Sequence, residues 1–347
     1  MEYYSCEWLQ SFYMMFTGHI DDGNFMAFCC EPKSDRPGIS VKERTVTESL
    51  DAFLEYRNLI IEASKKFAEE NPDSDVIPPI NGCKDCVNFK KAEWETKESV
   101  CRVNFSVYPS PCQSKCVYCF VNRTKFEATD ELKEKYEKVF SIVDESINRN
   151  LIDSNTKFQI SCGEITIHPY RNRIYEYVKD KSAVFFTNCF KYDEHIAECL
   201  SKFSDSAINF SIDAGLSDTW QKVKGVNNFE KVIDNLVKYH NAAQDPNQIT
   251  LKYILLPGIN TTEEDFLNLI NIMNTLKITH LEISRNVHGK NDLSKDKTDL
   301  LYSAAYFTVL CLANGIESVS YNSFSEKEES MISKTIDLII EELESNN

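Results

Sequence analysis

Two kinds of hydrophobic pattern alternate along the chain from about residue 101 onward. Short runs rich in β-branched and aromatic residues predict strands, whereas apolar residues that recur every three or four positions predict amphipathic helices. The expected strands are 101–109, 157–163, 183–188, 207–213, 249–258 and 280–286, and the expected helices are 131–150, 192–203, 229–244, 262–277 and one within 320–347. Connections long enough for crossover helices favour parallel strands. The pattern therefore predicts an α/β fold, a partial (β/α)6 TIM-like barrel.

The first hundred residues follow a different pattern. Aromatic-rich runs at 11–20 and 24–30 flank Asp22-Gly23, a dipeptide typical of hairpin turns. Residues 45–70 carry apolar residues at helical spacing, with Thr47 or Ser49 as the expected N-cap. The expected organisation is a hairpin-plus-helix domain over 1–100, the barrel over 101–290 and a helical extension over 291–347.

The charge of the chain narrows the classes of partner. Its 347 residues include 38 basic and 54 acidic side chains, a formal net charge of −16. Nucleic acids and anionic membrane surfaces attract basic proteins, so neither partner is expected. The N-terminus MEYYSCEWLQ lacks the basic and apolar regions of a secretory signal, and no run of about 18 apolar residues occurs. We expect a cytoplasmic protein.

Thirteen cysteines are many for a chain in a reducing compartment, where metal-binding or catalytic thiols are favoured over disulfides. Cys112, Cys116 and Cys119 lie in the stretch CQSKCVYCF, directly after the first expected barrel strand. Barrels of this kind carry their sites at the C-terminal ends of strands. Three thiolates suit an iron–sulfur cluster that leaves one iron open. A zinc site with Cys101 as a distant fourth ligand is the alternative.

This stretch resembles the CxxxCxΦC signature of the radical S-adenosylmethionine (radical SAM) enzymes, with Tyr118 in the aromatic position. The resemblance implies a 4Fe-4S cluster on the three cysteines, with S-adenosylmethionine bound to the open iron. It further implies a one-electron reductant of the flavodoxin or ferredoxin type, and a 5′-deoxyadenosyl radical that abstracts a hydrogen atom from the substrate.

Two later stretches also resemble motifs of this family. In ISCGEITIHP, where Cys162 replaces the usual first glycine, Gly163 and Glu164 are expected to face the methionine ammonium group. Cys162 could return a hydrogen atom to a substrate radical, or could simply be a small buried residue. In FSIDAG, Ser211 and Asp213 are expected near the carboxylate or ribose of the cofactor.

Two further cofactor contacts are expected on weaker motifs. Asn188 ends the strand AVFFTN and is a candidate residue of the cofactor pocket. Lys222, or Lys224 beside it, stands in TWQKVKG, where relatives often carry an arginine for the cofactor carboxylate.

The N-terminal cysteines resemble a SPASM/Twitch auxiliary-cluster domain placed before the barrel. The matching parts are Cys6, the turn Ile20-Asp21-Asp22-Gly23, the pair Cys29 and Cys30, and the CxxC of Cys83 and Cys86. The resemblance implies one auxiliary 4Fe-4S cluster, with Cys29 favoured over Cys30. A structural zinc site on the same four thiolates is the alternative.

The resemblance implies an enzyme of a kind that often modifies ribosomally made peptides by crosslinking, epimerisation or thioether formation. The resemblance therefore implies a peptide substrate first, and oxidation or epimerisation of a sugar or small alcohol second. A non-catalytic iron–sulfur or zinc scaffold is the remaining reading.

Overall fold

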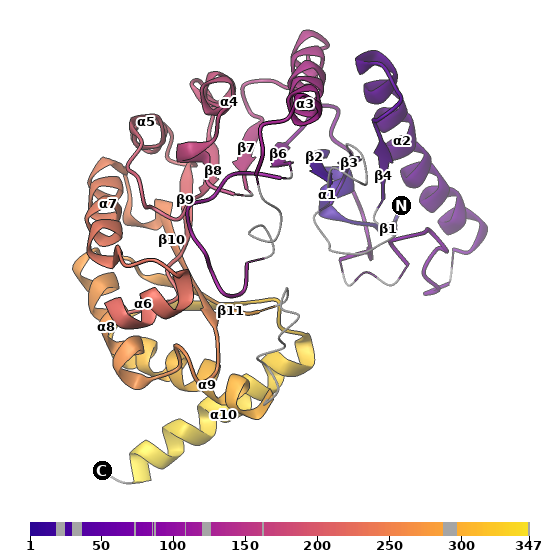
Figure 1. The fold of residues 1–347 in the computed structure, drawn as a ribbon. Helices are drawn as coiled ribbons and strands as arrows, with labels where there is room; N and C mark the ends of the chain where they lie inside the picture. The colour runs from indigo at the N-terminus through magenta and orange to yellow at the C-terminus, as the bar shows by residue number, and fades with distance from the viewer. Residues whose placement is uncertain are drawn as a thin grey trace. The chain divides into compact units, whose positions relative to one another are not determined.

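The computed structural model describes residues 1–18, 25–29, 37–72, 74–84, 86, 88–107, 109–119, 126–161, 163–286 and 297–345 (Figure 1). The chain forms two compact units. The first comprises Met1–Ser110, Phe126–Cys162 and Asp180–Ala183, and the second comprises Pro111–Lys125, Gly163–Lys179 and Val184–Asn347. These units do not follow the expected boundaries at residues 100 and 290, and those boundaries stay predictions.

The first unit is built on strands in the order β7-β6-β2-β3-β4. The strands are β2 (Tyr13–Gly18), β3 (Phe25–Ala27), β4 (Gly38–Ser40), β6 (Arg102–Val107) and β7 (Lys157–Ile160). β6 pairs in parallel with both β2 and β7, whereas β2 with β3 and β3 with β4 pair antiparallel. The expected hairpin is thus present as β2 and β3, and its turn residues Asp22 and Gly23 lie outside the described residues.

The remaining elements of the first unit are β1 (Tyr3–Ser5), α1 (Glu7–Gln10), α2 (Val46–Glu70), β5 (Lys90–Ala92) and α3 (Asp130–Asn148), and β1 pairs antiparallel with β5. Helix α2 begins one residue after Thr45, whose side chain accepts from the N–H of Glu48 while Glu48 accepts from the N–H of Thr45. The reciprocal pair is a capping box. The expected caps Thr47 and Ser49 are therefore wrong, because both residues already lie inside the helix.

The second unit is an α/β structure whose strands are all parallel. They run in the order β8 (Ala183–Phe186), β9 (Ala207–Ser211), β10 (Ile249–Leu255), β11 (His280–Arg285) and β12 (Ser318–Asn322). The helices are α4 (Arg171–Val178), α5 (Glu194–Lys202), α6 (Ser217–Lys224), α7 (Phe229–Ala242), α8 (Glu263–Thr275), α9 (Lys297–Ala313) and α10 (Glu326–Ser345). The expected strands and their parallel direction are confirmed.

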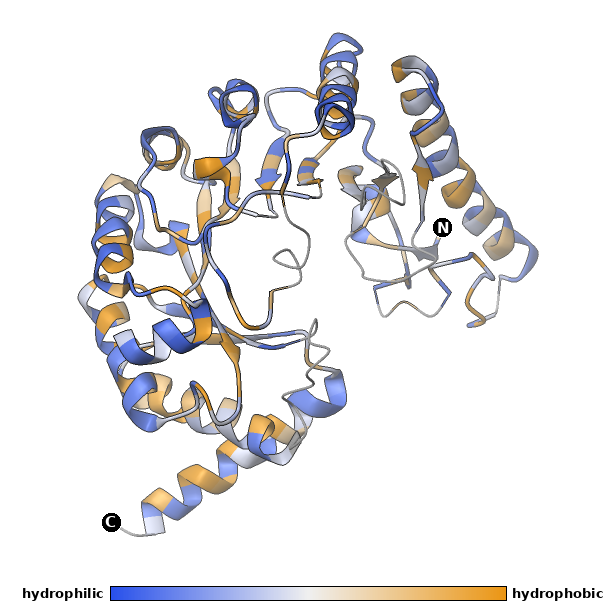
Figure 2. Ribbon diagram, viewed as in Figure 1, coloured by the Kyte–Doolittle hydropathy of each residue, from blue (hydrophilic) through white to orange (hydrophobic). Residues whose placement is uncertain are grey.

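Alternation along the strands separates two faces of this sheet. In β10, Leu251 and Tyr253 are fully buried, whereas Lys252 between them and Ile254 after them are half-buried. Successive strand residues point to opposite faces, so the apolar residues of β10 form one face and pack with Phe266 of α8 and Phe307 of α9. Figure 2 shows the hydrophobic residues gathered along these strands. The other face carries the polar residues.

One feature of the second unit differs from expectation. The C-terminal region expected to be wholly helical contains β12, which continues the parallel sheet beside β11. Its sequence SVSYN is short and polar, so hydrophobicity alone does not mark it as a strand. Among the described residues, no helix is both long and apolar enough to span a membrane.

Candidate functional site

The three-cysteine loop, residues 111–119, is held by the main chain of the second unit. The N–H of Lys115 donates to the carbonyl of Lys224 at 2.9 Å, and that of Val117 donates to the carbonyl of Val223 at 3.0 Å. At the start of the loop, the carbonyl of Pro111 accepts from the N–H of Glu164 at 2.7 Å. The loop is thus tied to the last turn of α6 and to the segment after β7 in the sequence.

The thiols of this loop have polar neighbours of the kind that a bound thiolate uses. The amide of Asn188 donates to Sγ of Cys112 at 3.5 Å, and the hydroxyl of Ser114 lies 2.9 Å from Sγ of Cys116. Burial raises the pKa of Cys112 to about 12, and the negative charges of Glu164 and of the other two cysteines add to this effect. A bound cation would reverse this effect, since thiolate is the ligand form.

The donor chemistry of Cys112, Cys116 and Cys119 fits a cluster held by three cysteines. In the described part of the chain, however, no three Cys, His, Asp or Glu side chains are gathered as a metal-binding group. The assignment of Cys112, Cys116 and Cys119 as ligands therefore stays a prediction, supported by their shared loop and mutual electrostatic contact.

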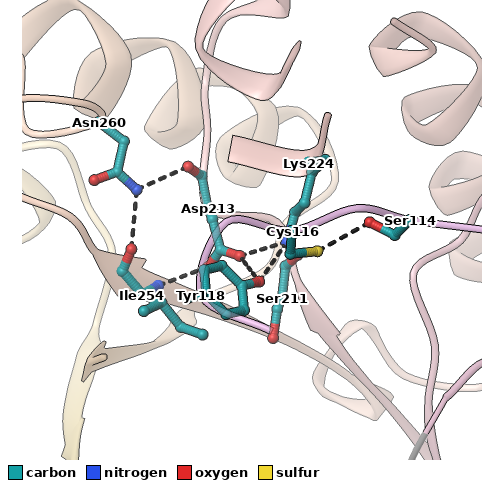
Figure 3. Close-up of polar contacts among 8 residues, drawn as sticks. All are labelled: Ser114, Cys116, Tyr118, Ser211, Asp213, Lys224, Ile254 and Asn260. Atoms are coloured by element: carbon teal, nitrogen blue, oxygen red, sulfur yellow. Dashed lines mark hydrogen bonds and ion pairs between the residues drawn. The ribbon is translucent and has the colours of Figure 1, made fainter. Parts of the chain in front are cut away.

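A buried polar network lies beside the loop (Figure 3). The hydroxyl of Tyr118 donates to Oδ2 of Asp213, and the ammonium of Lys224 donates to the same Oδ2 and to the Tyr118 hydroxyl, the latter at 2.8 Å. Lys224 also donates to the carbonyl of Ser211 at 2.6 Å. Burial and the Asp213 charge raise the pKa of Tyr118 well above its usual value. Burial would lower the pKa of Lys224, but the charge and hydrogen bond of Asp213, together with the charges of Cys116 and Cys112, outweigh burial and raise that pKa.

The network continues into strand β10. Oδ1 of Asp213 accepts from the N–H of Ile254 at 2.6 Å, and the amide of Asn260 donates to the carbonyls of Asp213 and Ile254, each at 2.9 Å. Asp213 has a φ of 52°, a left-handed conformation that Asp tolerates better than most residues. Both carboxylate oxygens of Asp213 thus have protein partners. Its expected contact with the cofactor ribose stays a prediction.

Glu164 is enclosed in a second polar cluster. The carboxylate is fully buried and accepts from the N–H and hydroxyl of Thr166, from the hydroxyl of Thr187 and from the N–H of Asn188. Burial raises its pKa, although the hydrogen bonds from Asn188 and Thr166 offset part of that effect. A cationic partner, such as an ammonium group, would lower this pKa again, because it stabilises the charged carboxylate.

The other expected cofactor residues lie at different places in the structure. Ser211 ends β9 beside the network, and Gly163 precedes Glu164 with a φ of 66°, a conformation that favours glycine. The expectation for Lys222 stays a prediction. Its side chain is exposed on α6, while Lys224, two residues later, is 2% exposed and joins the network. Cys162 lies outside the described residues.

Sequence reasoning left Lys224 undecided and missed other residues of these clusters. Lys224 was an equal candidate to Lys222, but it shares a helix face with the buried Trp220 and Val223, and that spacing could have identified it. Asn260, Thr166 and Thr187 follow strands or lie in short turns and carry no spacing signal.

The N-terminal cysteines belong to the first unit. Burial raises the pKa of Cys6 to about 11, and the negative charges of Cys29 and Cys86 add to the effect, which places the three thiols in mutual electrostatic contact. The N–H groups of Trp8 and Leu9 lower that pKa by hydrogen bonding to the Cys6 sulfur. Cys83 is buried and precedes Cys86 in one turn, where the N–H of Cys86 donates to the carbonyl of Cys83 at 2.9 Å. Cys30 and the turn at Ile20 and Asp21 lie outside the described residues.

Residues 109–270 match the family model described as the Radical SAM superfamily. The chain contains a radical SAM domain. Members of this superfamily hold a 4Fe-4S cluster and S-adenosylmethionine, and this domain spans the cysteine loop, Glu164 and the Asp213 network. The match begins at residue 109, after the N-terminal cysteines, so it gives no support for an auxiliary cluster there.

Individual relatives are distant. A UPF0026 protein of Helicobacter pylori (strain J99 / ATCC 700824) is 22% identical over 228 residues, which cover 61% of this chain and 70% of the relative. The crystal structure of Streptococcus suis SuiB bound to S-adenosylmethionine is 14% identical, with a TM-score of 0.50, and the match covers 79% of this chain and 56% of SuiB. SuiB bound to its precursor peptide SuiA gives 14% identity and a TM-score of 0.49, covering 93% of this chain and 73% of SuiB. The likeness to S-adenosylmethionine-bound SuiB shows the fold of a radical SAM structure.

Proposed function

We propose that this radical SAM enzyme cleaves S-adenosylmethionine reductively and abstracts a hydrogen atom from a ribosomally made peptide. The observation that carries the proposal is the CxxxCxYC loop, Cys112 to Cys119, inside the matched domain. When bound, the cluster and S-adenosylmethionine supply the radical chemistry. The protein supplies the ligands, the orientation of the cofactor and the exclusion of water.

The roles of the chain's own residues follow from their contacts. Cys112, Cys116 and Cys119 would hold the cluster, with Ser114 and Asn188 donating to the sulfurs of Cys116 and Cys112. Glu164, oriented by Thr187 and Asn188, would pair with the methionine ammonium group through Oε2. Ser211, at the end of β9, would face the carboxylate or ribose.

An auxiliary 4Fe-4S cluster is proposed on Cys6, Cys29, Cys83 and Cys86. Its support is the electrostatic contact of Cys6 with Cys29 and Cys86, together with the turn that joins Cys83 to Cys86. Zinc would use the same thiolates. The auxiliary domain is also what favours a peptide substrate, because the resemblance to SPASM/Twitch proteins carries that association.

A second candidate, oxidation or epimerisation of a sugar or small alcohol, is favoured by a row of polar residues across the second unit. In the strand register, Lys252 of β10 stands beside Ser211 of β9 and Glu282 of β11, and Glu282 stands beside Ser320 of β12. Lys252 Nζ lies 2.8 Å from Oε1 of Glu282, and both side chains are 18% exposed. The row meets the Asp213 network at Ser211, whose carbonyl accepts from Lys224, and Lys252 lies two residues, about 7 Å, before Ile254 along β10.

The proposed chemistry is tested with anaerobically reconstituted full-length protein, dithionite or a flavodoxin system as reductant, and S-adenosylmethionine. We expect 5′-deoxyadenosine from the wild type and none above background from Cys112→Ala, Cys116→Ala or Cys119→Ala. Cys101→Ala is the matched control, because Cys101 is the distant ligand that a zinc site would need. Undiminished 5′-deoxyadenosine in the loop variants would overturn the proposal, as would equal loss in Cys101→Ala without loss of folding.

The two substrate classes are separated by Lys252→Met. For a small polar substrate in contact with the row, product formation should fall at least tenfold. Formation of 5′-deoxyadenosine without substrate should stay normal, since the Lys252 side chain pairs with Glu282 rather than with the Asp213 network. For a peptide bound elsewhere, product formation with that peptide should stay within about twofold of the wild type.

A further inference from the structure

The ammonium group of Lys224 is enclosed within the second unit. Its side chain is 3% exposed, and that of its partner Asp213 is 0% exposed. A lysine ammonium carries three N–H donors, and all three have acceptors among the described residues: the carbonyl of Ser211, the hydroxyl of Tyr118 and Oδ2 of Asp213. A ligand carboxylate would have to displace one of these acceptors. Lys224 is therefore saturated by the protein and has no donor to spare for the cofactor.

The same residue holds the cysteine loop through its main chain. Its carbonyl accepts from Lys115, and the carbonyl of Val223 accepts from Val117, so Cys116 lies between two residues whose main chain is fixed. Tyr118, whose hydroxyl contacts Lys224 and Asp213, directly precedes Cys119. Two of the three cysteines are thus flanked by residues that are bonded to the end of α6 or to its ion pair.

We propose that Lys224, Asp213 and Tyr118 form a latch that holds the cysteine loop in its ligand-bearing shape before a cluster is inserted, with Lys224 as the positioning residue. Every contact of the latch joins protein to protein, so none of them requires bound metal. Asp213 is itself fixed from the far side by Ile254 and Asn260, which makes the latch a link between β10 and the loop. A phenylalanine at position 118 would occupy the aromatic slot but could not join the latch, since it lacks the hydroxyl.

The latch is tested by amide hydrogen exchange on the full-length, cluster-free protein, in the absence of S-adenosylmethionine and substrate. Lys224→Met should speed exchange in peptides covering residues 111–119 by on the order of tenfold, because the loop opens more often when its contacts are lost. Lys222→Met is the matched control: it removes an exposed lysine from the same helix and should leave exchange in this loop unchanged. Loop exchange in Lys224→Met equal to that in Lys222→Met would overturn the proposal.

A second variant covers the case in which Lys224→Met fails to fold because Asp213 is left buried without its cation. Tyr118→Phe removes one hydroxyl and no charge, and should speed exchange in the same peptides by roughly threefold while leaving circular dichroism unchanged. The rate of iron uptake during anaerobic reconstitution should be highest in the wild type, lower in Tyr118→Phe and lowest in Lys224→Met. Wild-type exchange and iron uptake in Tyr118→Phe would show that the hydroxyl plays no part in the latch and would overturn it.

A carboxylate-binding role for Lys224 predicts a different pattern. Loop exchange without ligands would then be normal, and only the affinity of reconstituted Lys224→Met for S-adenosylmethionine would fall. The exchange measurement contains neither cluster nor substrate, so its outcome is independent of the proposed reaction. An enzyme that fails to make 5′-deoxyadenosine could still show the latch, and the reverse also holds.

Discussion

The main-chain N–H of Lys115 lies 2.9 Å from the carbonyl oxygen of Lys224, and the residue after Lys224 is a glycine with a φ of 70°. A Cβ on Gly225 would lie 2.9 Å from Cβ of Lys115 and 3.1 Å from its carbonyl oxygen. Gly225→Ala should therefore both strain the end of α6 and push the cysteine loop away. We expect a loss of stability of about 1–3 kcal/mol and lower iron content after reconstitution, measured by urea unfolding and iron analysis.

Gly258→Ala separates strain from contact in this experiment. Gly258 has a similar φ of 76°, but a Cβ there would meet nothing within 4 Å. The free energy of unfolding of Gly258→Ala should fall by about 1–2 kcal/mol from strain alone, and the variant should keep the wild-type iron content. Equal iron loss in both variants would show that general destabilisation, rather than the approach of Gly225 to Lys115, controls the loop.

Arg57 is expected to hold the segment that carries Cys6. Its guanidinium donates to the carbonyls of Leu9, Gln10 and Lys97 at 2.8–3.1 Å and lies 4.2 Å from the centre of the Phe12 ring. Arg57→Met would leave buried carbonyls unpaired, so we expect a loss of about 3 kcal/mol in the free energy of unfolding. Urea denaturation followed by circular dichroism measures it.

Lys66→Met provides the comparison for Arg57, because Lys66 lies on the same helix α2 with its side chain 74% exposed. It should change the free energy of unfolding by less than about 0.5 kcal/mol. If the two variants unfold at the same urea concentration, the contacts of Arg57 contribute nothing measurable.

His168 should make the protein less stable as the pH falls. Burial lowers the pKa of His168 from 6.5 to about 4, and its Nδ1 accepts from the N–H of Tyr170 at 3.2 Å, so the folded state favours the neutral ring. Between pH 6.5 and 4 the unfolded chain binds a proton that the folded chain does not, so stability decreases with falling pH by up to about 3 kcal/mol. His168→Asn retains an acceptor and should remove this part of the pH dependence. Thermal unfolding of both proteins between pH 4 and 7 checks it, and parallel curves would contradict the assignment.

Metal analysis should distinguish an auxiliary iron–sulfur cluster from zinc. Three cysteines in the loop and four in the first unit imply about eight irons and eight sulfides per chain if each site holds a cubane. Cys83→Ala combined with Cys86→Ala should halve the iron while leaving 5′-deoxyadenosine formation largely intact and stopping substrate conversion. About four irons with one zinc in anaerobically isolated wild type would contradict the second cluster, and normal product from the double variant would show that the site is dispensable.

The strands were predictable because burial imposes a pattern on their sequence. In β10, residues buried against the helices alternate with half-buried ones, and β6 to β11 all show apolar runs between polar segments. The strands β1, β4 and β5 have three residues each, too few to show a period, and were missed. The cap of α2 was misplaced although its signal, threonine followed three residues later by glutamate, was present at Thr45.

The candidate site was predictable from sequence only where its residues belong to local motifs. The cysteine spacing and the Gly163-Glu164 pair are local in sequence, so they indicate a site without knowledge of the fold. The pairing of Lys224 with Asp213 joins the end of α6 to the segment after β9, and it depends on which face of α6 is buried. Asn260 reaches the same network from beyond β10, a relationship that only tertiary structure creates.

The parallel pairing of β2 with β6 has a consequence for how the protein can be divided. Six residues of β2, from Tyr13 to Gly18, are in register with six residues of β6, from Arg102 to Val107. A shortened chain that starts at residue 101 would lose this neighbour and present the main-chain donors and acceptors of β6 to solvent, an edge prone to aggregation. The N-terminal segment is thus a strand that the first barrel strand needs for solubility, and gene fusions or truncations that retain the cysteine loop must retain it too.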